Sequence, residues 1–500
     1  MDRWGSPRLS GRGAARVPAR ATFGRPVGSL LVASALGLAC SALGTPLEPC
    51  TEDADCRGAF GWGSVCLDDG LCSEVVTHPR CTKTYPEDLF SRPEKYRDAV
   101  LIGAAFSYVN DDDTAAAAEL AVRQIRARGG EGGIEFALVT CDTTENAGDE
   151  LDDMAATREV TRYLAQTLSV PAILATRGSE RTLQAWSVVE DMDILMISPS
   201  ATSPALTEAD ETSPTDEQPG RLWRTVPPDS VQSQVMAQDI FGRGVVRIAI
   251  IEQVGAYGDS LSALLAQDFT ALGGQVVETI AYDGTLVDAV ADAAVLDVQE
   301  VVVISSDVPD YINFLNAASS NPQLAATYDG FGMFFPDAAY NERIYLEPSA
   351  SAEIFYDNIR GSRPAPATGS LYGSFTGAFV LEYGKSPDTR AFAAHAYDAA
   401  YLIMYASLWA RAVEGEITGT SLARGLRKIS DGPALNIRTS AWPEAVETLG
   451  AGIGVDVSGA SGLLDYDPAT EETTAPIELW AIVPDGDSWI FASDGDPITP

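Results

Sequence analysis

The sequence predicts an α/β fold made of two doubly wound parallel-sheet lobes, preceded by a small disulfide-rich segment. From about residue 96, short runs that are apolar throughout alternate with helical patterns. This alternation is typical of parallel sheets whose two faces are covered by helices. Residues 208–220, which are rich in acids, Pro and Gly, divide the alternation into two series. At 500 residues the chain also exceeds what one hydrophobic core usually organises, so we expect one domain for each series.

Each series predicts strands and helices in turn. In the first, a helix begins at Thr114 and Gly129-Gly130 ends it. The expected strands of this series cover 99–106, 134–140, 172–176 and 194–198, and its other helices cover 157–168 and 182–190. In the second series, helices are expected at 230–241, 258–272, 286–296 and 311–318, and strands at 245–252, 275–282, 301–305 and 330–335. A helical stretch follows at 391–413. The Gly-rich run 450–454 lies far from any strand-to-helix junction, which favours a loop over a nucleotide-binding fingerprint.

The composition is strongly acidic, with a formal net charge of −38 at pH 7. Loss of the Arg-rich N-terminus would make the remaining chain more negative still. Such a surface repels nucleic-acid phosphates and anionic lipid headgroups, so we expect no nucleic-acid partner. The charge indicates solubility and leaves the function open.

Residues 1–39 have the pattern of a signal peptide: an Arg-rich start followed by a short apolar run at 27–39. That run is too short to span a membrane as a mature helix. Cys40 follows directly and resembles the lipidated cysteine of a bacterial lipoprotein, although Gly37 stands where an aliphatic residue is usual. Cleavage after Gly44 and simple secretion is the alternative. We expect an exported protein attached to the membrane by a lipid anchor alone, and Ser41 favours the outer membrane.

Six further cysteines agree with export into an oxidising compartment. Four of them fall within residues 50–72, among Asp, Gly and Trp and without apolar periodicity, and they predict a small knot with two internal disulfides of open connectivity: Cys50, Cys56, Cys66 and Cys72. Cys81 and Cys141 then pair by elimination. A zinc site is the alternative, but there is no C-x-x-C and His78 is the one nearby histidine. We expect no metal here.

The sequence lacks the parts that an enzyme would need. Its two histidines, His78 and His395, have no metal-ligand spacing, and it contains no G-x-S-x-G elbow. His395 fits a packing role. We therefore expect neither catalysis nor a cofactor.

Several motifs, taken in order, resemble the type I periplasmic binding protein family, in its branched-chain amino-acid-binding group. They are the first strand-loop-helix at 98–130, ISPSATSPAL at 197–206, RTVP at 224–227, AYG at 256–258, ALGG at 271–274, AYDA at 396–399 and SGLLDYD at 461–467. The resemblance covers about 97–490 and leaves the Cys-rich segment and linker 40–95 outside. No single motif is decisive, but their order and spacing are fairly specific.

The resemblance implies two lobes whose chain crosses between them three times. Lobe 1 would comprise 97–225 and 352–455, and lobe 2 would comprise 226–351 and 456–490. A small amino-acid-like ligand would lie between the lobes and stabilise their closed arrangement. The expected function is capture of this ligand for an ABC importer, with its permease as partner. A tethered sensor or envelope interaction protein of the same fold is the alternative.

The resemblance also assigns the carboxylate end of the ligand. Ser179 and Thr202 match positions whose hydroxyl and N–H groups hold the carboxylate, and Ser200 matches a main-chain carbonyl that accepts from the ammonium. Each lies where a parallel strand ends and a helix begins, and free N–H groups at a helix start favour anions. The alternative is that Ser179 and Thr202 are ordinary N-caps.

Four more residues are assigned to the cleft. Tyr257 matches an aromatic residue against the ligand, and Asp337 matches the acid that pairs the α-ammonium, as a carboxylate in a closed cleft requires. Asp307 is a further acid that follows a strand, and Phe392 matches a ring of the side-chain pocket. The alternative for Tyr257 is a turn residue, and the alternative for Phe392 is a ring packed in the core. Asp337 and Asp307 could instead be solvated surface acids. The loop 107–113 departs most from the family, which leaves the ligand side chain open.

Overall fold

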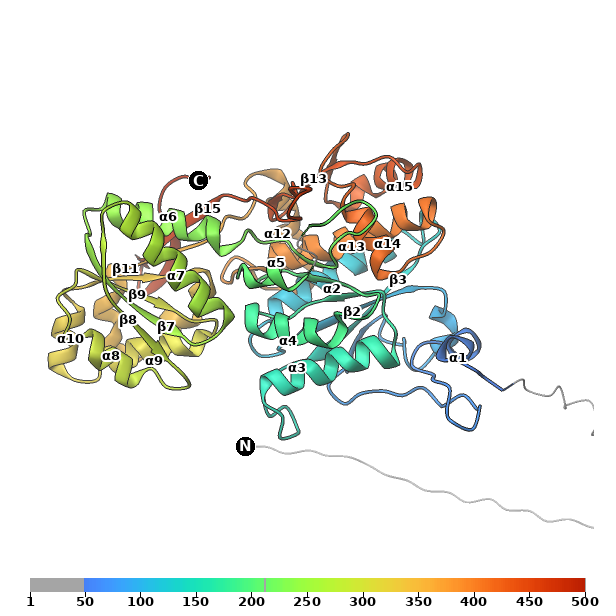
Figure 1. Cartoon of the computed structure of the whole chain (residues 1–500), viewed down its shortest axis with the longest axis horizontal. Coiled ribbons are helices and arrows are strands. Elements are labelled where there is room, and N and C mark those ends of the chain that lie inside the picture. The colour runs from blue at the N-terminus through green and yellow to red at the C-terminus, as the bar shows by residue number, and fades with distance from the viewer. Residues whose placement is uncertain (1–48, 211–212, 500) are drawn as a thin grey trace, which may run out of the picture. The chain divides into compact units, whose positions relative to one another are not determined.

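The computed structural model describes residues 49–210 and 213–499. The expected signal segment 1–39 and the lipidation position Cys40 lie outside the described residues. Two α/β lobes, on the right and left of Figure 1, make up most of the compact unit Cys50–Pro500. The predicted fold class is confirmed.

The first lobe is built on a six-stranded sheet of order β1-β3-β2-β4-β5-β6. Its strands are β1 (Lys83–Tyr85), β2 (Val100–Phe106), β3 (Phe136–Asp142), β4 (Ala172–Leu174), β5 (Leu195–Ser198) and β6 (Leu222–Arg224). All neighbours are parallel except β1, which pairs antiparallel with β3. One face packs against α2 (Asp112–Arg126) and the almost wholly buried α13 (Ala393–Val413), and the other against α3 (Asp153–Arg162) and α4 (Ser179–Val189). Burial of both faces explains why β2 is apolar along its whole length.

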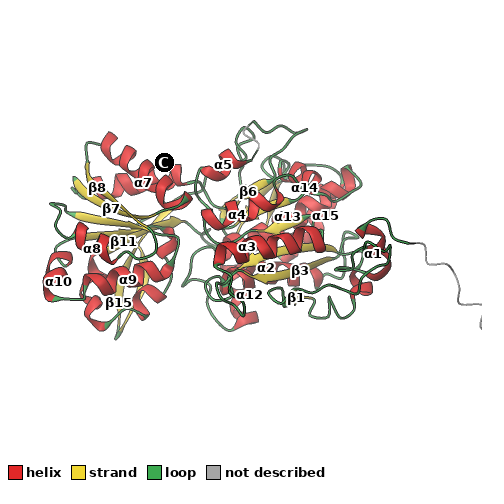
Figure 2. Ribbon diagram, turned by 60° about the horizontal axis from the view of Figure 1, so that its bottom comes forward, coloured by secondary structure: helices red, strands yellow, loops and turns green. Residues whose placement is uncertain are grey.

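The second lobe is built on a seven-stranded sheet of order β16-β15-β11-β10-β9-β7-β8. Its strands are β7 (Arg247–Gln253), β8 (Gln275–Tyr282), β9 (Glu300–Ile304), β10 (Gly332–Phe335), β11 (Ile359–Pro364), β15 (Ile477–Asp485) and β16 (Ser488–Ser493). The helices are α6 (Asp229–Gly242), α7 (Ala256–Ala271), α8 (Val287–Ala293), α9 (Val308–Ala318) and α10 (Pro322–Tyr328). The first five strands are parallel, and β15 and β16 complete the edge antiparallel. Figure 2 shows the strands of each lobe with helices packed around them.

The chain crosses between the lobes three times, and two crossings lie later than the resemblance implied. The first, between β6 and α6, agrees with a boundary at 225. The second follows Pro364 and not residue 351, because β11 pairs with β10 and β15 in the second sheet. The third follows Tyr466 and not residue 455, because β13 (Asp456–Gly459) and Tyr466 pack into the core of the first lobe. The run IRGSRP of β11 lacks the apolar signal of the other strands.

Further elements of the first lobe carry weak sequence signals. They are α5 (Ala205–Ala209), α12 (Ser370–Tyr383), α14 (Gly419–Leu426), α15 (Trp442–Gly450) and a small sheet of β12 (Ala434–Asn436), β13 and β14 (Gly462–Leu463). The Gly-rich run 450–454 leaves the end of α15 as the expected loop. None of the helices in the described part of the chain has the length and hydropathy of a membrane span.

The disulfide-rich segment is joined to the edge of the first lobe. The expected pairing of Cys81 with Cys141 is confirmed, and the four other cysteines form Cys50–Cys66 and Cys56–Cys72 around α1 (Asp53–Phe60). The Trp62 indole donates to the carbonyl of Tyr96 at 2.9 Å, and the Tyr163 hydroxyl donates to the carbonyl of Val76 at 2.8 Å. Together with β1 pairing on β3, these contacts cover a sheet edge that would otherwise be open.

Candidate ligand-binding site

The predicted site residues gather at the carboxyl ends of the parallel strands, where open α/β sheets bind their ligands. In the first lobe they follow β4 and β5, apart from Phe392 directly before α13, and in the second they follow β7, β9 and β10. Gly178 and Gly255 allow the sharp turns from β4 into α4 and from β7 into α7, since their φ angles of 77° and 139° lie in the left-handed region. The loops of both lobes therefore face one cleft.

A small cavity lies between these loops. Eight residues line it: Arg177, Gly178, Ser200, Tyr257, Ser306, Asp337, Ala338 and Phe392. Four of the seven predicted ligand residues are among them. Its volume of about 10 Å³ is room for about one water molecule, so a ligand requires the lobes to move apart or the lining side chains to rearrange.

Asp337 and Tyr257 form the second-lobe wall of the cavity. Asp337 begins a 3₁₀ turn after β10 and is 1% exposed. Its Oδ1 accepts hydrogen bonds from the Tyr257 hydroxyl and, at 3.4 Å, from the amide of Gln232. Burial raises the pKa of Asp337. A cation bound beside this carboxyl would favour its ionised form.

Two further acceptors beside Asp337 escaped the sequence analysis. Asp229 Oδ1 and Gln232 Oε1, both at the start of α6, are buried and have no hydrogen-bond partner among the described residues. Burial and the neighbouring Asp337 raise the pKa of Asp229 to about 7. Buried acceptors are rarely left unpaired, and an ammonium group with three N–H donors has the matching chemistry. In the sequence, the pattern D-x-x-Q after RTVPP was the signal that could have pointed to these two acceptors.

Arg177 is the other residue that sequence reasoning missed. It lies in the loop between β4 and α4, and it reaches across to the second lobe. Its Nη2 donates to the carbonyl of Ala338 at 3.0 Å and its Nε to the carbonyl of Ser306 at 3.3 Å. No periodicity marks one arginine in a loop, so the sequence carried no signal for this role.

Ser179 and Thr202 lie beside the cavity without lining it. Both side chains are fully buried. The Ser179 hydroxyl accepts from the N–H of Ser203 at 3.0 Å. Thr202 Oγ1 makes no hydrogen bond of full geometry, but it lies beside the Asp229 carboxyl and lowers the pKa of that group. Neither is an N-cap, because Gly178 caps α4 and Pro204 caps α5. The alternative of ordinary capping is therefore wrong.

The other predicted residues differ in the contacts that they already make within the protein. Ser200 Oγ accepts from the N–H of Gly178 at 3.3 Å. Asp307 accepts from Arg181 at 2.8 Å and from Gln253 at 2.9 Å, and although burial opposes it, Arg181 keeps the pKa of Asp307 low. Phe392 has a φ of 75°, a left-handed conformation that costs a non-glycine residue about 1–2 kcal/mol. Such strain at a cavity is typical of functional positions.

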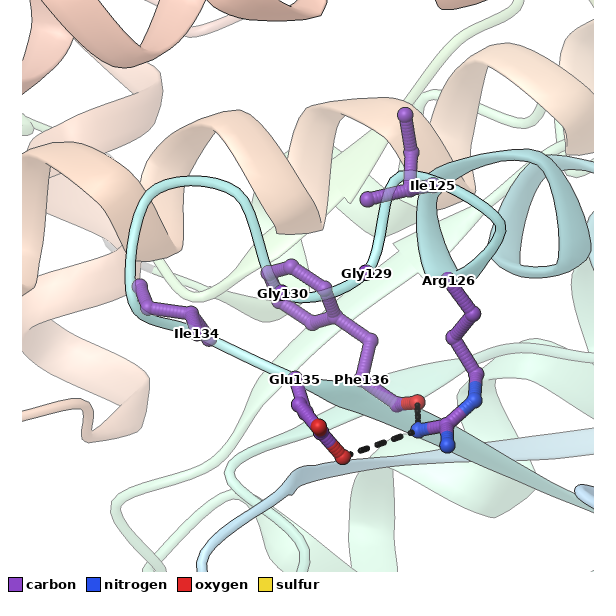
Figure 3. A pocket seen from close by; sticks show the side chains of 7 residues that line it. All are labelled: Ile125, Arg126, Gly129, Gly130, Ile134, Glu135 and Phe136. Atoms are coloured by element: carbon purple, nitrogen blue, oxygen red, sulfur yellow. Dashed lines mark hydrogen bonds and ion pairs between the residues drawn. The ribbon is translucent and has the colours of Figure 1, made fainter.

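Two other hollows have a different character. Figure 3 shows one at the amino end of β3, where Arg126 donates to the carbonyl of Phe136 at 2.6 Å and lies 3.6 Å from Glu135. A groove of about 500 Å³ runs past Arg363, Tyr372 and Glu478. Neither contains a predicted ligand residue, although the groove lies at the carboxyl end of β11, between residues of both lobes.

Comparison with known proteins agrees with this architecture. Residues 105–440 match a family model described as periplasmic binding protein. The chemotactic signal transduction system substrate-binding protein BasB of Halobacterium salinarum is 25% identical over 371 residues, which cover 72% of this chain and 79% of BasB.

Solved structures share the fold at low identity. The branched-chain amino acid transporter substrate-binding protein LivJ of Streptococcus pneumoniae, in complex with isoleucine, is 17% identical, with a TM-score of 0.59 over 79% of this chain and 100% of LivJ. A solute-binding protein of an ABC transporter from R. palustris, in complex with 4-hydroxybenzoate, is 14% identical, with a TM-score of 0.62 over 80% of this chain and 97% of that one. The family match spans more than half of the sequence, and the two-lobed topology agrees with it. The chain therefore belongs to the type I periplasmic binding protein family.

Proposed function

We propose that this protein captures an α-amino acid, or a closely similar zwitterion, between its two lobes. The observation that carries the proposal is a group of buried acceptors around Asp337, the carboxyl that lines the cavity. Asp337, Asp229 Oδ1 and Gln232 Oε1 lie together on the second lobe and lack a cationic donor among the described residues. A primary ammonium supplies both the charge and the N–H groups that these acceptors need.

The carboxylate of the same ligand would bind on the first lobe. The 11-residue helix α4 begins at Ser179 beside the cavity, and its free N–H groups carry partial positive charge. The Thr202 hydroxyl lies near it, beside the Asp229 carboxyl, and would turn from that carboxyl to donate to the ligand. Closure around a zwitterion would then place each end of the ligand against the lobe of complementary polarity.

A thermal-shift screen of the secreted domain tests this proposal. Amino acids, amides, polyamines and benzoates would be tested side by side. A true ligand at 100 times its Kd stabilises the protein by about 2.7 kcal/mol. Stabilisation by an amino acid is the expected result, and stabilisation by polyamines or benzoates alone would contradict the assignment.

We further propose export with a lipid anchor on Cys40 and delivery of the ligand to the permease of an ABC importer. The family match and the disulfides support export. Globomycin-sensitive processing and an acyl label on Cys40 are expected. A mature N-terminus at Thr45 would contradict the anchor and leave the ligand assignment untouched.

A tethered chemosensor is the second candidate function. The relative BasB is by its name part of a chemotactic signal transduction system. The additional disulfide-rich segment, which the resemblance does not cover, also suits a fixed receptor. Deletion of the gene distinguishes the two: an importer component is needed for ligand uptake, whereas a sensor is needed for the response to the ligand while uptake continues.

A further inference from the structure

The cavity has one fixed positive charge at its wall. Among the described residues that line it, Arg177 is the cation and Asp337 is the anion. The Arg177 side chain is only 14% exposed, so its guanidinium is largely withdrawn from water. A guanidinium stays charged at any physiological pH. Its charge therefore needs a partner when the cleft closes.

The hydrogen-bond acceptors of Arg177 are neutral, and its ion pair with Asp111 is long. Two of its five N–H groups are used in hydrogen bonds to the main-chain carbonyls of Ser306 and Ala338. Its nearest carboxylate is Asp111, whose Oδ1 lies 3.8 Å from Nη1, beyond hydrogen-bond length. Asp111 is itself used locally, since its other oxygen accepts from the N–H of Ser107 at 3.1 Å. Donors on Nη1 and Nη2 thus remain for another acceptor.

Arg181, four residues further along the chain, is an arginine of this cleft whose charge is paired with carboxylates. Its guanidinium donates to the carboxylates of Asp153 and Asp307. It does not line the cavity. Arg177 and Arg181 therefore both bridge the lobes, but Arg177 alone of the two lines the cavity and donates its hydrogen bonds to neutral acceptors only.

We propose that Arg177 binds a second anionic group on the ligand, so that the site selects acidic amino acids over neutral ones. This inference rests on the proposed function, because it assumes that Asp337 and the start of α4 hold the ammonium and the α-carboxylate. A side-chain carboxylate presents two oxygens in a plane, which matches the planar fork of a guanidinium. In the closed form it would replace the Ser306 and Ala338 carbonyls as the partner of Arg177.

A neutral ligand would leave Arg177 with its 3.8 Å ion pair to Asp111 but without a hydrogen-bonded carboxylate. Glutamine offers Arg177 one carbonyl oxygen and an NH₂ group that cannot accept, whereas glutamate offers two charged oxygens of the same size and shape. The difference between the two ligands thus isolates the charge from packing and from the contacts of the α-amino and α-carboxyl groups.

Calorimetric titration with two isosteric pairs, glutamate with glutamine and aspartate with asparagine, tests the inference on the full mature protein. At least one acidic member should bind the wild type about 10- to 150-fold more tightly than its amide. Arg177→Met should remove that preference by weakening the acid and leaving the amide little changed. Arg177→Lys, which keeps the charge without the fork, should keep part of the preference.

Arg181→Met is the matched control. It breaks a contact between the lobes without changing the cavity wall, so it should change the Kd of acid and amide by the same factor. If Arg177→Met also changes both by the same factor, Arg177 only ties the lobes together and the inference is wrong. The inference is equally wrong if the amides, or larger neutral amino acids, bind the wild type as tightly as the acids. If no α-amino acid binds at all, the proposed function fails, and the inference fails with it.

Discussion

The two lobes share one architecture, but the charged residues that line the cavity are opposite in sign, Arg177 from the first lobe and Asp337 from the second. The first lobe contributes Arg177, just before α4, and Arg181, in its first turn, together with the acids Asp111 and Asp153 that pair with them. The second contributes the carboxyls of Asp229, Asp307 and Asp337, each at the start of a helical segment. A ligand with separated charges fits between such surfaces in one orientation. The direction of the charge separation across the cavity is therefore set by a few residues in these loops. It does not follow from the strongly acidic composition of the whole chain.

The lobes also differ in covalent support. All seven cysteines precede residue 142, so the second lobe has none. The bridge between Cys81 and Cys141 ties the linker to β3 inside the first lobe. Stability of the first lobe therefore depends on redox conditions, whereas that of the second does not.

The largest effect is expected when this disulfide support of the first lobe is removed. Replacing both Cys81 and Cys141 with Ala opens a loop of 60 residues and should lower the free energy of unfolding by about 4 kcal/mol. Denaturant titration followed by hydrogen exchange should show the loss in the first lobe. The unaltered exchange of the second lobe is the internal control, and an equal loss in both would contradict independent support of the lobes.

Asp337→Asn tests the negative side of the cleft. The substitution leaves the ammonium without its counter-charge, and affinity should fall at least about 10- to 150-fold. The unliganded melting temperature should hold, since the neutral amide replaces a carboxyl whose pKa is already raised by burial. Calorimetry with the best ligand of the screen measures the effect, and an unchanged Kd would place the ammonium elsewhere.

Thr202→Ala tests the opposite end of the ligand. The hydroxyl caps no helix and makes no hydrogen bond of full geometry among the described residues, so unliganded stability should change little. Loss of one hydrogen bond to a carboxylate should weaken binding by about 10-fold or slightly more. A fall in melting temperature with unchanged affinity would instead assign Thr202 a structural role.

The effect of pH on stability and on ligand affinity should be smaller than the effects of these substitutions, and its sign follows from the pKa of Asp229. In the empty protein burial and Asp337 raise the pKa of Asp229 to about 7, against 3.8 as the ordinary value. Between these values the folded state holds a proton that the unfolded state has lost, so stability should decrease as pH rises from about 4 to 7. An ammonium ligand must displace that proton. Its affinity should therefore rise up to about tenfold per pH unit below 7 and level off above it. Titrations at pH 6 and 8 in buffers of different ionisation enthalpy would detect the released proton.

The sequence predicts the fold well where burial imposes a simple pattern. Strands such as β2 and β9 are covered on both faces and are apolar apart from Glu300 at the start of β9, so their positions were clear. The strand β11 was missed because its run IRGSRP carries two arginines and a proline. That one omission moved the second lobe boundary from Pro364 to residue 351.

Prediction of the site was limited by contacts that form only on folding. Asp337 and Tyr257 follow strands within recognisable motifs, and both line the cavity. Arg177 and Asp229 gain their roles from partners in the other lobe or in a distant loop, and no spacing in the sequence encodes such contacts. The pairing of Asp307 with Arg181, which are 126 positions apart, is of the same kind.

Titration of one amino acid beside two truncated analogues tests the central claim most directly. The analogues would be the same molecule without its ammonium and the same molecule without its carboxylate, each titrated by calorimetry into the mature protein. The account predicts that the intact amino acid binds and that each analogue binds at least about 10-fold more weakly, because each leaves one lobe without its charge partner. Equal affinity for the analogue without the ammonium would contradict capture of a zwitterion between cavity walls of opposite charge.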